Sequence, residues 1–174
     1  MSPPAAASDR MGPTVNASSA VSVEPAPVVK SGVYRNLFLE VGKTEEEIGA
    51  KLEAALEDFF HGDDSIRCYY PVGTDEAYIL DSGNNDVRSE GMSYGMMIAV
   101  QAGRKTELDR LWNFARRHLR NASGDRQGYF AWRASTDGTV RDRESASDGE
   151  EYFAMSLFFA WKRWGDESYK AAAD

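Results

Sequence analysis

The most constraining feature of this chain is an apolar helix that begins with a carboxylate and carries two glycines. Residues 88–97 are RSEGMSYGMM, and apolar side chains continue to Val100. Because nearly every face of such a helix is apolar, we expect it to be buried on most sides. Gly91 and Gly95 share one face, and each costs roughly 1 kcal/mol relative to alanine in a helix interior. The two glycines would let another backbone approach, and we expect close packing or space for a ligand to offset that cost.

The start of this helix carries a candidate functional acid. Ser89 is predicted to cap the helix through its hydroxyl, which places Glu90 in the first turn beside the positive end of the helix dipole. Two interpretations stay open: a dipole partner, or a carboxyl at the rim of a pocket. The dipole favours the ionised carboxylate, whereas an apolar pocket favours the neutral acid that a general acid needs.

A second helix repeats this arrangement. Residues 148–164 are apolar nearly all round, begin with Asp148 and stop at Gly165. Asp148 and Glu151 resemble a capping box, so a cap is the alternative to a functional acid. The parallel with Glu90 favours the functional interpretation, because both buried helices then carry a carboxylate at the same kind of end.

Amphipathic helices alternate with the two buried ones. Order is predicted to begin near Val33, and the first long amphipathic helix starts at a capping box of Thr44 and Glu47. A second runs from about Leu108 to Leu119 with arginines on its solvated face, whereas residues 66–87 are predicted to be extended chain and loop. Buried helices inside a ring of amphipathic ones predict an all-α toroid with the acids gathered at one end.

A long loop is predicted at residues 122–147, and it contains the aromatic run GYFAW that ends at Trp132. Long loops in compact domains are usually functional or mobile. A tryptophan face stacks well on a sugar ring, but Trp132 could equally anchor the loop on the core. The run Asp81–Asp86 lacks the glycine and ligand positions of an EF-hand, and turn residues explain it.

Composition excludes several classes of function. The net charge of -8 over 174 residues argues against nucleic acid or an anionic membrane as the main partner. Cys68, His61 and His118 give neither a disulfide nor zinc-ligand spacing, so no metal or cofactor is expected. No apolar run approaches the roughly 20 residues of a membrane span. Residues 1–32 are predicted to be a disordered tail without an export signal, which favours a cytoplasmic location.

Two motifs together resemble glycoside hydrolase family 8. They are SEGMSYGM at residues 89–96 and ASDGEEYFAMSL at residues 146–157. Within the family, YRNLF at residues 34–38, DSGNNDVR at residues 81–88 and DGEEY at residues 148–152 are most similar to the reducing-end xylose-releasing exo-oligoxylanases. The resemblance implies an (α/α)6 barrel that hydrolyses β-1,4-linked xylo-oligosaccharides with inversion. It implies that Glu90 is the proton donor and Asp148 a second active-site carboxylate. The residues that it implies for sugar binding are Trp132, Asn85, Arg88 and Tyr94.

The chain supplies only about two of the six helix pairs of such a ring. We therefore interpret residues 33–174 as the N-terminal part of a catalytic domain, without the general base, and expect this polypeptide alone to be inactive or poorly folded. The full-length protein is expected to be a monomer. The alternatives are an endo-acting family 8 glucanase or xylanase, a non-catalytic sugar-binding module, and a helical scaffold in which both acids are caps.

Overall fold

The computed structural model describes residues 34–174, so the predicted tail at residues 1–32 lies outside the described residues. The helices are α2 (Leu37–Glu40), α3 (Glu45–His61), α4 (Ser89–Ala102), α5 (Lys105–Phe114), α6 (Ser147–Trp164) and α7 (Glu167–Ala173). A π-helical turn, η1 (Ala115–Leu119), continues α5. The strands are β1 (Tyr69–Val72), β2 (Glu76–Asp81), β3 (Asp86–Arg88), β4 (Arg133–Ala134) and β5 (Val140–Asp142).

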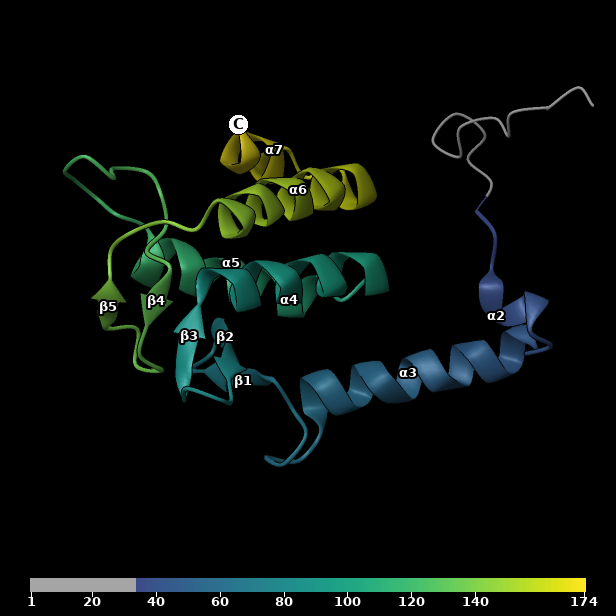
Figure 1. Cartoon of the computed structure of the whole chain (residues 1–174). Coiled ribbons are helices and arrows are strands. Elements are labelled where there is room, and N and C mark those ends of the chain that lie inside the picture. The colour runs from purple at the N-terminus through teal and green to yellow at the C-terminus, as the bar shows by residue number, and fades with distance from the viewer. Residues whose placement is uncertain (1–33) are drawn as a thin grey trace, which may run out of the picture.

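Helices α4, α5 and α6 lie side by side and the small sheet sits at one end of them, while α3 extends away from this body (Figure 1). The core lies where these helices meet the sheet. Its fully buried large side chains are Phe60, Val87, Met92, Met96, Val100, Leu108, Leu111, Phe114, Leu119, Phe153 and Leu157. The sheet therefore closes one end of the helical layer, and α4 continues directly from β3.

The all-α prediction is incomplete, because the chain also forms a five-stranded antiparallel sheet in the order β1-β2-β3-β4-β5. The prediction of extended chain at residues 66–87 is confirmed by β1, β2 and β3. The predicted loop at residues 122–147 was wrong in part, because it contains β4 and β5. These strands have only two and three residues, too few for the alternating pattern that identifies a strand in a sequence.

The predicted helix ends are confirmed where a glycine stops the helix, whereas two of the predicted N-caps are wrong. Helices α4 and α6 end at Gly103 and Gly165, which have φ of 75° and 71° in the left-handed region. The capping box at Thr44 is confirmed. Ser89 and Asp148, in contrast, are not caps: the N-cap residues are Arg88 and Ala146, and neither makes a side-chain capping bond.

The close approach at the glycine face of α4 comes from a side chain of the sheet. A Cβ added at Gly95 would lie 2.6 Å from Cγ1 of Ile79, whereas one at Gly91 would lie no nearer than 3.5 Å to the same side chain. The expected close packing is therefore confirmed at Gly95, but the neighbour is a side chain and not another backbone. Gly95 makes room for the isoleucine that fastens β2 to α4.

Helices α4 and α6 expose one apolar face to solvent. We call this the open face; it comprises Tyr94, Ile98, Tyr152, Met155 and Phe159, with exposed fractions of 36–46%. The prediction that α4 and α6 are buried on most sides therefore fails on this face within the described chain. Exposed apolar surface of this kind marks a place for further packing.

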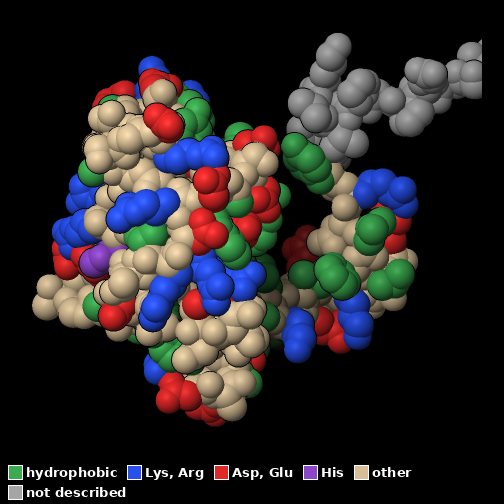
Figure 2. All heavy atoms as spheres, turned by 60° about the vertical axis from the view of Figure 1, so that its left-hand side comes forward, with side chains coloured by type: hydrophobic (Ala, Val, Ile, Leu, Met, Phe, Trp, Pro, Cys, Tyr) green, Lys and Arg blue, Asp and Glu red, His purple; other side chains and the backbone are tan. Residues whose placement is uncertain are grey.

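The basic side of α5 and η1 is not simply solvated. Arg110 donates to the carbonyl of Thr74 at 2.9 Å, and Arg117 pairs with Glu76 at 2.6 Å. These contacts fasten the turn between β1 and β2 to the helix. Elsewhere acidic and basic side chains intermingle over the face in Figure 2, and no helix within residues 34–174 has both the length and the apolar character needed to cross a membrane.

Candidate active site

The two predicted acids start neighbouring helices at the same end of the layer. Glu90 is the second residue of α4 and Asp148 the second of α6. The helix ends touch at the following glycine, since a Cβ at Gly149 would lie 2.6 Å from Oγ and 3.3 Å from the backbone carbon of Ser89. The structure therefore brings the acid-bearing turns together, as the parallel between the helices predicted.

Tyr94 links the two helices at this end. Its side chain lies one turn after Glu90, and its hydroxyl donates to Oδ2 of Asp148 at 2.9 Å. That hydrogen bond, ahead of burial and the nearby charges, raises the pKa of Tyr94 above its ordinary value. Tyr152 packs edge-on against the Tyr94 ring at a centroid distance of 4.8 Å. The link holds the exposed carboxylate of Asp148 in a fixed direction.

Glu90 is partly buried in the first turn of α4. The hydroxyl of Ser89 donates to Oε2 of Glu90 at 3.2 Å, so the serine that was predicted to cap the helix instead contacts the acid. The pKa of the nearby Arg88 is raised by its hydrogen bond to Asp86 first, and then by the charges of Asp86, Asp81 and Glu90. The carboxyl of Glu90 thus has one hydroxyl donor and one cation nearby.

Trp132 is both anchored to the fold and adjacent to the acid. Its carbonyl accepts from the backbone N–H of Ser89 at 3.0 Å, and its own N–H donates to the carbonyl of Glu144 at 2.8 Å. The guanidinium carbons of Arg88 and Arg133 lie 5.3 Å and 6.0 Å from its ring centroid, within cation–π range. The two interpretations of Trp132 are therefore compatible, since the backbone anchors the chain beside Glu90 and the indole stays partly exposed.

Arg88 and Asn85 are placed differently from the acids. Nε of Arg88 pairs with Oδ2 of Asp81 at 2.8 Å and with Oδ1 of Asp86 at 3.2 Å. Asn85 lies in the turn between β2 and β3 with φ of 52° and lines a polar pocket of about 450 Å³ with Arg133. Neither Glu90 nor Asp148 lines that pocket, so the structure does not join Asn85 to the acid pair.

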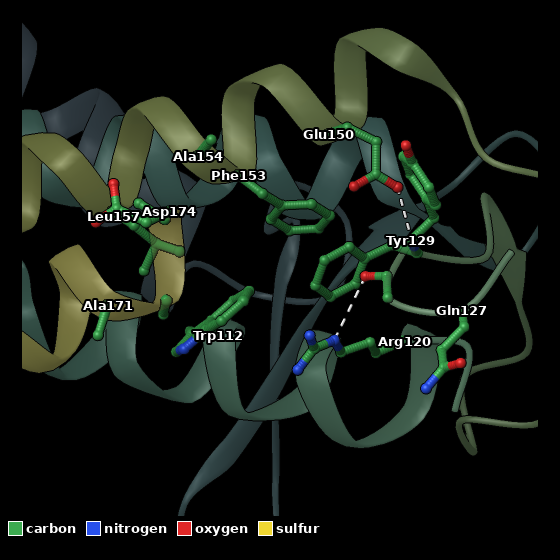
Figure 3. A pocket seen from close by; sticks show the side chains of 14 residues that line it. Trp112, Arg120, Gln127, Tyr129, Glu150, Phe153, Ala154, Leu157, Ala171 and Asp174 are labelled. Atoms are coloured by element: carbon green, nitrogen blue, oxygen red, sulfur yellow. Dashed lines mark hydrogen bonds between the residues drawn. The ribbon is translucent and has the colours of Figure 1, made fainter. Parts of the chain in front are cut away.

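The sequence did not predict the hydrogen bond that Glu150 makes with the loop before Trp132. Glu150 lies in a pocket of about 530 Å³ between α5, α6 and α7 (Figure 3), and its Oε1 accepts from the backbone N–H of Phe130 at 2.7 Å. Burial raises the pKa of Glu150, and the hydrogen bond from Phe130 partly opposes that effect. The rings of Phe130 and Phe153 pack at 4.7 Å. Glu150 thereby fastens to α6 the segment that leads to Trp132, an acceptor role that no local pattern signals.

These residues offer proton transfer and stacking. Carboxylates held close together can divide acid and base work between them, and an aromatic ring can support an apolar sugar face. Within residues 34–174 there is no group of three His, Cys, Asp or Glu side chains placed to hold a metal ion. The residues described above supply carboxylates, hydroxyls and an indole.

Comparison with known proteins agrees with this chemistry. The model of glycosyl hydrolases family 8 matches residues 73–174. The reducing-end xylose-releasing exo-oligoxylanase of Paenibacillus barcinonensis is 55% identical over 136 residues, which are 78% of this chain and 36% of that protein. The corresponding enzyme of Halalkalibacterium halodurans is 50% identical over 133 residues, covering 76% of this chain and 34% of that one.

These matches place the chain among the glycosidases. More particularly, it belongs to glycosyl hydrolases family 8, and the resemblance inferred from the two motifs is confirmed. The chain spans about a third of the length of the curated relatives that it matches.

Solved structures match the fold as well. A xylose complex of the Paenibacillus barcinonensis protein aligns with a TM-score of 0.82 at 52% identity, over 84% of this chain and 40% of that one. A crystal structure of a reducing-end xylose-releasing exo-oligoxylanase aligns with a TM-score of 0.82 at 47% identity, with the same coverage. The helices and the small sheet described above are therefore the arrangement of this part of a family 8 protein.

Proposed function

We propose that the complete protein is a reducing-end xylose-releasing exo-oligoxylanase that cleaves β-1,4 bonds of xylo-oligosaccharides with inversion. Residues 33–174 are then the N-terminal part of its catalytic domain. The observation that carries the proposal is the hydrogen bond from Tyr94 to Asp148, which ties the two acid-bearing helix ends together beside Trp132. Identities of 55% and 50% to two exo-oligoxylanases support the choice of substrate.

Each residue has a stated part in the proposed reaction. Glu90 donates its proton to the glycosidic oxygen as the bond to the leaving xylose breaks. Asp148, oriented by Tyr94, accepts hydrogen bonds from sugar hydroxyls and holds the ring in a reactive shape. Trp132 stacks on a sugar ring, and Arg88 and Asn85 contact hydroxyls at the edge of the site.

Besides Glu90 and Asp148, inversion needs a general base that removes a proton from the attacking water. Acid and base in inverting glycosidases stand about 6.5–9.5 Å apart, which leaves room for that water. The chain matches about a third of the length of its relatives, and we propose that this base lies in the remaining part. The 174-residue chain alone is accordingly expected to hydrolyse no xylo-oligosaccharide.

The test uses the protein encoded by the complete reading frame and xylotriose that carries deuterium on its reducing-end carbon. The expected products are deuterated xylose and unlabelled xylobiose. Inversion predicts that the α-anomer of xylobiose appears first in the proton NMR spectrum. Unlabelled xylose with deuterated xylobiose would contradict release from the reducing end. Xylobiose that appears first as the β-anomer would contradict inversion.

An endo-acting family 8 enzyme is the second candidate, and a specific match favours it. An endoglucanase of Cellulomonas uda is 32% identical over 102 residues, 57% of this chain. An endo-acting enzyme would shorten polymeric xylan or glucan into mixed oligomers and would prefer long substrates to xylotriose. A non-catalytic sugar-binding module would bind xylotriose and release nothing.

A further inference from the structure

Two arginines face one another across the pairing of β3 and β4. Arg88 lies directly opposite Arg133 in this antiparallel register, and like charges in that position destabilise a sheet. The carboxylate of Asp86 lies between them, with Oδ1 accepting from Nε of Arg88 at 3.2 Å and Oδ2 from Nε of Arg133 at 2.5 Å. Its side chain is only 6% exposed, so the two hydrogen bonds are what compensates this buried charge.

Both arginines also contact the same aromatic ring. Their guanidinium carbons lie 5.3 Å and 6.0 Å from the centroid of Trp132. The indole has a further polar partner in Asp142, because hydrogen bonds from the backbone of Glu144 and from the Trp132 side chain lower the pKa of that carboxyl. The ring thus lies beside two cations and a carboxylate.

Asp86 is the anchor that these two cations share. Arg88 has a second carboxylate, Asp81, at 2.8 Å. Among the ion pairs of the described residues, Arg133 has Asp86 alone. Without the carboxylate at position 86, Arg133 would lose its ion pair and keep only the charge interaction with Asp142 across the β4–β5 pairing. The two guanidinium groups would then repel one another beside the indole.

We propose that Asp86 is a positioning residue: through Arg88 and Arg133 it fixes the orientation of the Trp132 indole, and hence the surface on which a sugar ring stacks. The part that concerns sugar rests on the proposed function. The part that concerns the indole rests on the contacts above. In this proposal Asp86 acts through the two arginines and not on the reacting atoms.

The experiment uses the complete protein labelled with 5-fluorotryptophan, with Trp132→Phe identifying the fluorine resonance of Trp132. In Asp86→Asn, which keeps the shape and removes the charge, we expect that resonance to shift or broaden while those of Trp112 and Trp161 stay in place. With xylotriose, KM should rise about three- to tenfold, the range of one weakened aromatic contact, while kcat stays within about twofold.

Asp81→Asn is the matched control, because it removes one partner of Arg88 but leaves the bridge through Asp86 intact. It should move the Trp132 resonance less than Asp86→Asn does. If Asp86→Asn does not fold, Arg133→Gln cuts one arm of the bridge at a half-exposed site, and the same shift is expected.

Two results would overturn the inference. One is an unmoved Trp132 resonance in Asp86→Asn or its substitute Arg133→Gln; the other is an equal movement of all tryptophan resonances, which would indicate a general loss of structure. If xylotriose neither binds nor reacts but Trp132 moves selectively, the proposed function fails while the role of Asp86 in placing the indole stands.

Discussion

The contact between the acid-bearing helix ends predicts opposite effects for two equivalent glycine substitutions. Gly91 and Gly149 are each the third residue of their helix and each follows a candidate acid. Alanine at Gly149 would place its Cβ 2.6 Å from Oγ, 3.0 Å from Cβ and 3.3 Å from the backbone carbon of Ser89. The hydroxyl can rotate away, but the Cβ and the backbone cannot. Alanine at Gly91 meets nothing nearer than 3.5 Å.

The magnitudes follow from two competing terms. Replacing glycine by alanine in a helix gains up to about 1 kcal/mol in propensity, and overpacking costs about 1–3 kcal/mol. Gly91→Ala should therefore be neutral or raise the free energy of unfolding by up to about 1 kcal/mol. Gly149→Ala should lower it by about 0–2 kcal/mol. The two variants should thus differ by about 1–3 kcal/mol.

Urea denaturation of the two variants and the parent measures this difference directly. Gly149→Ala should also weaken the bond between Tyr94 and Asp148, because the two helix ends are pushed apart, and Gly91→Ala should not. Equal stability of the two variants would refute overpacking against Ser89, because the gain in helix propensity is the same for both.

Three other predictions concern neighbouring groups. Because the folded pKa of Glu150 is raised above its ordinary 4.5, its contribution to stability is present at acidic pH and lost as pH rises through the raised pKa; urea denaturation should show the parent losing stability relative to Glu150→Gln over that range. Asp148→Asn should lower the pKa of Tyr94 toward its ordinary 10.0, and an unmoved ultraviolet titration would count against the hydrogen bond. Phe159→Glu on the open face should reduce self-association of the 174-residue chain in light scattering, since that side chain is 42% exposed.

Periodicity and helix signals predicted the helices well because those signals are local. The capping box at Thr44 and the stops at Gly103 and Gly165 are each decided by backbone groups within one turn. The same local logic failed at Ser89 and Asp148. Their side chains found partners outside their own turn's backbone, in the carboxylate of Glu90 and the hydroxyl of Tyr94.

The parts of the site that the sequence did not predict depend on long-range pairing. Nothing near position 88 indicates that Arg133 lies opposite it, because that register is set by a strand 45 positions later, as the pairing of Arg88 with Arg133 shows. Asp86 was interpreted as a turn residue for the same reason. The role of Glu150 as an acceptor depends on the contact between α6 and the backbone of Phe130, which lies 20 positions earlier. The placement of Glu90 and Asp148 in the first turns of two helices was predictable, because the apolar pattern of each helix is clear in the sequence.

The most direct test of the account is the rate of xylotriose hydrolysis by Glu90→Gln in the complete protein, measured together with xylotriose binding by calorimetry. The account predicts a loss of about 10²–10⁴-fold in rate, the usual contribution of a general acid, with the dissociation constant changed only a few-fold. A variant that hydrolyses xylotriose at the parent's rate would contradict the assignment of proton transfer to Glu90.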